Sequence, residues 1–221
     1  MVYKSLVGVT CACLAVVSFS ANSALVSRLG GLAYYDTEAD LTWLADAHPS
    51  YGTTYDYAYP GEGYLNWADA NAWAADLVVG GSANWRLPTT TDNCHTYGET
   101  EDLNVCSGSE MGNLYFNVLG NSLGGVVSNE GPFSNVYDGW ATYWSSTETL
   151  YYDSQTGNTY PLIMQFDMGL GFQGGTSVGT SGAYAWAVQS GDVGVVPVPA
   201  AVWLFGSGLI GLISVARRKK A

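Results

Sequence analysis

The chain has 221 residues, and all 19 of its aspartates and glutamates lie within residues 25–195. Only two of its seven lysines and arginines, Arg28 and Arg86, fall in that region, which therefore carries a formal charge of −17. Such a surface repels polyanions, so we exclude nucleic acid as a partner. Two explanations of the charge stay open: a divalent cation such as calcium as a companion, or the ordinary acidity of a soluble secreted protein.

The first 24 residues have the layout of a secretory signal peptide. Lys4 provides a positive charge, residues 6–19 form a short apolar core, and residues 20–24 are mostly small. A core of this length is too short for a convincing membrane-spanning helix. We therefore expect signal peptidase to remove residues 1–24 after export, with an uncleaved N-terminal anchor as the alternative.

The first half of the domain predicts two short strands followed by a helix. Residues 31–36 and 41–45 flank a polar turn, which is typical of a hairpin. Asn66 is a suitable N-cap for the helix, and Gly80-Gly81 is expected to end it. Between these ends, apolar residues recur at helical spacing, at Trp67, Ala70, Trp73, Ala74 and Leu77.

The second half predicts another helix and three more strands. Ser109 or Glu110 would begin the helix and Gly120 would end it. Its core-facing residues would be Met111, Leu114, Tyr115, Val118 and Leu119. The expected strands are residues 142–148, 161–166 and 183–189, the last with one face of small residues. Two helices, short antiparallel strands and long loops place the domain, residues 25–195, in the α+β class.

Cys94 and Cys106 are the only cysteines of this domain. In an oxidising compartment such a pair predicts a disulfide, which would stabilise the fold by about 3 kcal/mol on the chain-entropy model. His95 next to Cys94 raises a metal site as the alternative. The cluster offers at most three such ligands and lacks the paired spacing of zinc sites.

Five short motifs follow one another through the domain. They are Tyr-Asp with Leu-Thr-Trp near the start, Asn-Trp-Ala-Asp-Ala at 66–70, Trp-Arg-Leu-Pro-Thr at 85–89, Tyr-Trp-Ser-Ser-Thr-Glu at 143–148 and Ala-Trp-Ala-Val at 185–188. Together they resemble the Lcl C-terminal domain family. The resemblance implies a C-type-lectin-like fold and a surface or adhesive role, with glycan binding in some members. Gln189 stands where arginine is common in the family.

The C-terminal residues have the composition of a stop-transfer segment. Residues 200–216 are uncharged and mostly apolar, which predicts one hydrophobic helix, and four cations follow that should remain cytoplasmic. The stretch 196–221 resembles the PEP-CTERM signals, in the variant with a Val-Pro-Leu-Pro-Ala motif; Val198 stands where the founding motif has glutamate. The resemblance implies cleavage by an exosortase, a transient inner-membrane intermediate and delivery to the cell surface or extracellular matrix. Its characteristic residues are Pro197, Pro199, Trp203, Arg217 and Arg218.

No catalytic apparatus is evident in the domain. Its two histidines are isolated, and it has neither a Gly-rich phosphate motif nor a nucleophile elbow, so a hydrolase is the least favoured function. A glycan-binding domain and a purely structural matrix component are the two main readings. Tyr55, Tyr57 and Tyr59 are the candidate sugar-stacking residues, although the same loop could pack inward.

Arg86 is one of two cations in a very acidic domain, so we expect it to form a structural ion pair. Glu148, in the second of the two most specific motifs, is the predicted partner. Breaking a buried pair of this kind typically costs about 3–5 kcal/mol.

The tail generates the first testable prediction. If an exosortase processes it, the mature protein lacks the hydrophobic helix and the four cations that follow it. Intact-mass measurement on protein from a host that carries an exosortase tests this. Mature protein that keeps Arg217 and Arg218 would point to a plain single-pass anchor.

Overall fold

The computed structural model describes most of the central domain and neither end of the chain. The described residues are 25–50, 52–55, 62–90, 108–137, 139, 142–177, 179 and 182–194. The signal peptide 1–24 and the sorting tail 196–221, with its expected helix, lie outside them. Within the described ranges, no helix has the length and apolar character that crossing a membrane requires.

The first sheet has four antiparallel strands in the order β1-β2-β3-β7. They are β1 (Leu25–Arg28), β2 (Ala33–Asp36), β3 (Leu41–Leu44) and β7 (Val188–Ser190), with a 3-10 turn, η1 (Leu29–Gly31), after β1. The predicted β2–β3 hairpin is confirmed. Buried Asp36 fixes its turn by accepting hydrogen bonds from the backbone N–H groups of Glu38 and Ala39 at 3.0 and 3.2 Å.

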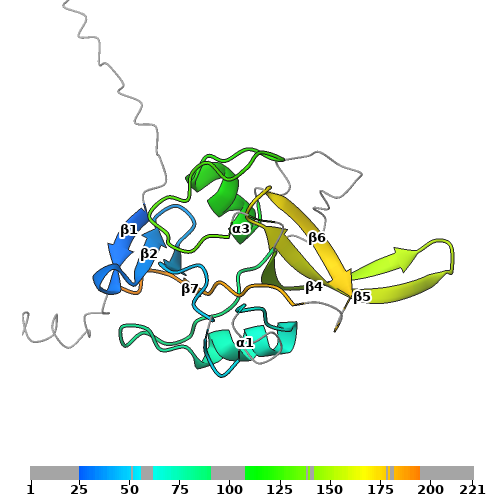
Figure 1. Ribbon diagram of the computed structural model, residues 1–221, viewed down its shortest axis with the longest axis horizontal. Coiled ribbons are helices and arrows are strands. Elements are labelled where there is room, and N and C mark those ends of the chain that lie inside the picture. The colour runs from blue at the N-terminus through cyan, green and yellow to red at the C-terminus, as the bar shows by residue number, and fades with distance from the viewer. Residues whose placement is uncertain are drawn as a thin grey trace, which may run out of the picture.

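The second sheet has three antiparallel strands in the order β4-β5-β6. They are β4 (Tyr143–Asp153), β5 (Asn158–Asp167) and β6 (Phe172–Ser177). The expected strands at 142–148 and 161–166 are confirmed but both are longer, because together they form a hairpin that extends beyond β6. This hairpin projects from the body of the molecule (Figure 1). β1 and β6 were not expected from the sequence.

The first helix, α1 (Trp67–Asp76), begins where the sequence predicts. The Asn66 side chain accepts a hydrogen bond from the Asp69 N–H at 3.0 Å, which satisfies one of the unpaired N-terminal donors. Ala70, Trp73 and Ala74 are buried, as the helical spacing indicates. The helix ends at Asp76, before the glycines at 80 and 81, which form a tight turn of their own.

The second helix consists of α3 (Glu110–Gly112) followed by a π-helical turn, η2 (Asn113–Val118). Ser109 caps it by accepting a hydrogen bond from the Gly112 N–H at 3.0 Å. The Leu119 N–H donates to the Leu114 carbonyl five residues back, which widens the final turn. The predicted start is confirmed, and the core-facing residues are buried except Val118, which is half-buried.

Residues 183–190 cross the middle of the molecule, between α1 on one side and α3 on the other (Figure 1). Only the last three form a strand, and residues 183–188 are buried on both faces. Their backbone makes hydrogen bonds of 2.8–3.1 Å with four separate parts of the chain, pairing Ala183 with Leu65, Tyr184 with Trp144, Ala187 with Leu44 and Val188 with Arg86. The expected regular strand at 183–189 is therefore a shorter strand preceded by a central connecting segment.

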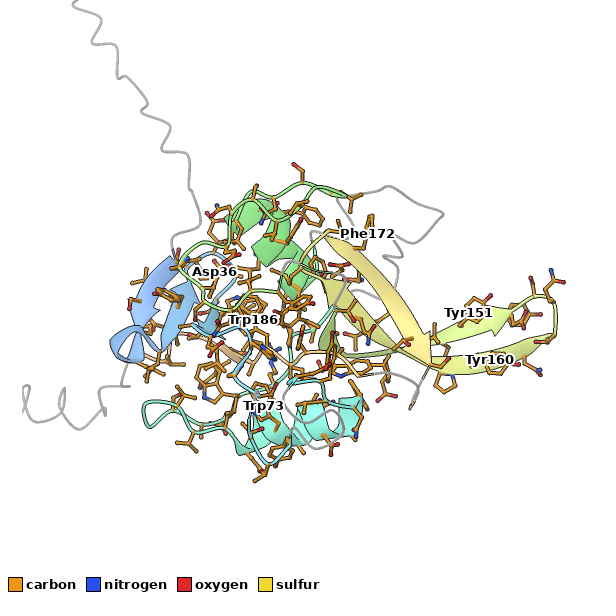
Figure 2. All side chains as sticks on the ribbon, viewed as in Figure 1. Asp36, Trp73, Tyr151, Tyr160, Phe172 and Trp186 are labelled. Carbon is orange, nitrogen blue, oxygen red and sulfur yellow. The ribbon has the colours of Figure 1, made fainter. Side chains whose placement is uncertain are left out.

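Trp186 is the largest side chain of this segment and lies at the centre of the core (Figure 2). Its indole N–H donates to the Leu44 carbonyl at 2.9 Å. Its ring makes edge contacts with Trp43 at 5.2 Å and with Phe133 at 4.9 Å between centroids. One side chain thus joins β3, the loop before β4 and the central segment.

We predict that Trp186→Ala lowers the free energy of unfolding by about 3–5 kcal/mol, because it leaves a large cavity and an unpaired Leu44 carbonyl. Urea denaturation followed by circular dichroism measures the change. Val126→Ala is the control: this valine is 73% exposed, so its truncation should change stability by less than about 0.5 kcal/mol. Similar losses in both variants would contradict the central role of Trp186.

Candidate functional site

The two most specific sequence motifs lie against each other and form a structural joint. The Ser146 N–H donates to the Pro88 carbonyl at 2.9 Å. The Thr90 N–H donates to the Thr147 hydroxyl, which in turn donates to the Thr90 carbonyl, both at 2.9 Å. Ser145 adds a buried hydroxyl contact to Thr90 at 3.1 Å. These polar side chains are engaged with each other, so they hold the second sheet to the Trp-Arg-Leu-Pro-Thr segment.

Arg86 forms an ion pair, but its partner is Glu110 and the predicted pair with Glu148 is wrong. The guanidinium donates to both carboxylate oxygens of Glu110 at 2.7 and 2.8 Å. The Thr89 N–H donates to the same carboxylate at 2.7 Å. Glu148 is exposed on β4, past the bulge that shifts the pairing of β4 with β5. Glu110 is favoured because it begins α3 directly beside Arg86.

Arg28, the other cation of the domain, is paired in the same bidentate way. It donates to the two carboxylate oxygens of Asp192 at 2.6 and 2.7 Å. The hydrogen bond from Arg28 lowers the pKa of Asp192 below its ordinary value. Both arginines of residues 25–195 are therefore already committed to carboxylates of the protein itself, and neither is placed to neutralise an anionic ligand.

The tyrosine loop is only partly within the described residues. Tyr55 is half-buried and packs against the core, and its hydroxyl donates to Asp76 at the end of α1. This contact fastens the loop to the helix, in keeping with the inward-packing alternative for Tyr55. Tyr57 and Tyr59 lie outside the described residues, and so do Cys94 and Cys106, so the stacking residues and the disulfide stay predictions.

A surface depression of about 330 Å³ opens at the end of β3, and we call it the Asp46 depression. Asp46, His48, Pro49 and Asn135 line it. Asp46 Oδ1 accepts hydrogen bonds from the His48 N–H at 2.9 Å and from the Asn135 amide at 3.0 Å. Its volume is within the range of about 300–1,000 Å³ that is usual for small-molecule sites.

Backbone pairing between two distant loops builds this depression. The Ala47 N–H donates to the Ser134 carbonyl, and the Ser134 N–H to the Ala45 carbonyl, both at 2.9 Å. Asn135 has a left-handed backbone with φ +56°, a conformation that asparagine tolerates better than most residues. This conformation follows directly on the paired Ser134 and brings the Asn135 amide to Asp46.

His48, which lines the depression, packs against a cluster of tyrosine rings. The His48 ring contacts Tyr184 edge-on at 4.4 Å, Tyr64 stacks on Tyr184 at 4.6 Å, and Tyr137 lies 4.8 Å from it. Gly63 allows the close approach of His48, because a Cβ there would lie 2.0 Å from its Nε2. Burial raises the pKa of the Tyr184 phenol, so this phenol stays neutral near neutral pH.

The depression offers hydrogen-bond acceptors beside the His48 ring. Asp46 Oδ2 and Asn135 Oδ1 accept no hydrogen bond from the described residues, so each can accept one from a ligand. Acceptors of this kind suit the hydroxyl donors of a polyhydroxylated, uncharged molecule. Among the described residues, no three His, Cys, Asp or Glu side chains form a group that could hold a metal ion.

No local sequence pattern points to this site. Asp46 and Asn135 are 89 positions apart, and each has the ordinary appearance of a loop residue. Comparison of the chain with protein-family models, with curated proteins and with solved structures finds no match.

The Arg86–Glu110 ion pair can be tested against the Glu148 pairing expected from the sequence. We expect Glu110→Gln to lower the free energy of unfolding by about 1–2 kcal/mol at pH 7, since the pair is half-buried, with side chains 35% and 19% exposed. Glu148→Gln, the same change at an exposed position, should have an effect below about 0.5 kcal/mol. Urea denaturation of both variants decides between the two partners. A larger loss from Glu148→Gln would restore the pairing expected from the sequence.

Proposed function

We propose that the protein is an exported, non-enzymatic glycan-binding protein with a C-type-lectin-like domain that reaches the cell surface or extracellular matrix. Signal peptidase and an exosortase would be its processing enzymes, and the inner membrane would hold it transiently through the C-terminal helix. The observation that carries the proposal is the Asp46 depression, where a carboxylate and an amide with free acceptor capacity lie beside the His48 ring, which packs on Tyr184.

The charge of the domain indicates which glycans would bind. Both of its arginines are held by Asp192 and Glu110. A sulfated or uronic-acid polymer would therefore meet 17 unbalanced negative charges with no cation available. We accordingly propose neutral polysaccharide as the ligand, with anionic polysaccharide binding only where calcium or another divalent cation bridges the like charges.

A purely structural role in the matrix is the second candidate. It is favoured by the joint between Ser146, Thr147, Pro88 and Thr90, since the residues most typical of the family resemblance hold the fold together there. A structural component needs no ligand-binding depression, so a binding measurement separates the two functions.

Asn135→Gly tests the glycan site with little disturbance of the backbone. Glycine adopts the left-handed conformation of Asn135 readily, so this change removes the amide alone. We expect binding to a neutral β-glucan or dextran, measured by affinity electrophoresis or calorimetry, to weaken about tenfold, or roughly 1.4 kcal/mol. Asp46→Asn, which keeps an oxygen acceptor at the same place, should weaken it less.

Asn84→Gly is the matched control, because Asn84 also has a left-handed backbone, with φ +71°, and is exposed away from the depression. It should leave binding unchanged. Equal losses from the two glycine variants would remove the Asp46 depression as the site. If the parent protein binds neither these neutral polymers nor alginate, with or without calcium, the glycan proposal fails and the structural role replaces it.

A further inference from the structure

The tip of the β4–β5 hairpin forms an arm, residues 149–161, that is separate from the rest of the second sheet. Pairing between β5 and β6 begins only at Leu162, opposite Ser177, so the arm consists of two strands. Figure 2 shows Tyr151 and Tyr160 far out on this projection. A free two-stranded ribbon is marginally stable in water, so its exposed apolar side chains call for an explanation.

The arm carries the main cluster of exposed large apolar residues among the described ones. The exposed fractions are 71% for Leu150, 54% for Tyr151, 63% for Tyr152 and 43% for Tyr160. Tyr151 and Tyr160 are directly opposite each other across the hairpin and so share one face, while Leu150 and Tyr152 lie on the other. Single exposed apolar residues are common, but a contiguous group marks an interaction surface.

The outer edge of β4 is open along the same stretch. Nearer the body, the edge is covered, because the Trp144 N–H bonds to Tyr184 and the Ser146 N–H to Pro88. From Glu148 to Asp153, the described residues supply backbone partners only from β5 and from the turn of the hairpin. Lysine, proline and bulges commonly protect such edges. This six-residue stretch has neither lysine nor proline, and the bulge of β4 lies before it, between Trp144 and Glu148.

We propose that this edge pairs with the same edge of a second copy of the chain, so that the arm is a homodimerisation element. An antiparallel strand pairs with its own copy about a two-fold axis without any other sequence. With Tyr151 opposite Tyr151, Glu148 faces Ser154 and Asp153 faces Thr149, so no two carboxylates lie directly opposite each other. Glu148 and Asp153 are the only charged residues between positions 148 and 161, so most of the edge is uncharged although the domain is strongly acidic.

A second copy suits this surface better than the other occupants. A neutral sugar would use the tyrosine faces but not Leu150, the most exposed of the four side chains. A lipid bilayer with anionic headgroups would repel a domain of charge −17. The interface is small for a stable complex, since only the short outer edge of β4 in each copy takes part, so we expect a dissociation constant on the order of 100 µM.

Sedimentation velocity on the exported, purified protein, at concentrations from roughly 10 µM to 1 mM, tests the dimer. The weight-average mass of the parent should rise over this range. The double variant Leu150→Lys with Tyr151→Lys should weaken association at least tenfold. Val78→Lys with Val126→Lys is the control, because these valines are 68% and 73% exposed elsewhere, and it should behave like the parent. A parent that stays monomeric at 1 mM, or equal weakening in both double variants, overturns the proposal.

Cysteine cross-linking gives a second measurement that does not depend on lysine being tolerated. In the proposed register residue 151 faces itself, within the reach of a disulfide. Tyr151→Cys should therefore give a covalent dimer on mild oxidation, and Val78→Cys should not. Equal cross-linking of the two cysteine variants means random collision and overturns the register.

If the monomeric protein instead binds neutral polysaccharide or uncharged vesicles and the arm lysines abolish that binding, the arm contacts those ligands and the dimer is rejected. Loss of glycan binding in Asn135→Gly with dimerisation intact would show that the arm and the Asp46 depression act separately.

Discussion

The whole architecture depends on burying residues 183–188 on both faces while their backbone groups still find partners. Four distant parts of the chain supply those partners, and each brings one structural unit to the centre of the molecule. The alternating alanines at 183, 185 and 187 are small enough for neighbours to approach closely, while Trp186 fills the space on the other side. Without this segment, the two sheets and α1 would share few contacts.

The distribution of charge is the second constraint. The domain has 19 acidic residues and only two arginines, and both arginines form bidentate ion pairs within the fold. Arg28 links β1 to Asp192, just after β7. Arg86, whose backbone pairs with Val188, links this part of the chain to Glu110 at the start of α3. Recognition of other molecules is thereby left to aromatic rings, carboxylates and amides, which favours uncharged partners.

The sequence was informative where structure is decided locally. Asn66 predicted the start of α1, and the turn after Asp36 predicted the first hairpin, because caps and turns depend on neighbouring residues. It failed where distant segments meet. The bulge in β4 leaves Glu148 exposed, and the pairing of Asp46 with Asn135 depends on two loops whose approach follows from the packed core. Neither outcome has a local pattern that could reveal it.

The position of β7 has a mechanical consequence. β7 pairs with β3 through Trp43 and Val188, and β3 leads within two residues to Asp46. Force between a ligand in the Asp46 depression and an attachment point beyond Asp192 would therefore pass through this short ladder and the Arg28–Asp192 pair. Tension along this path would not run through α1 or the second sheet, so the arm would keep its shape under load.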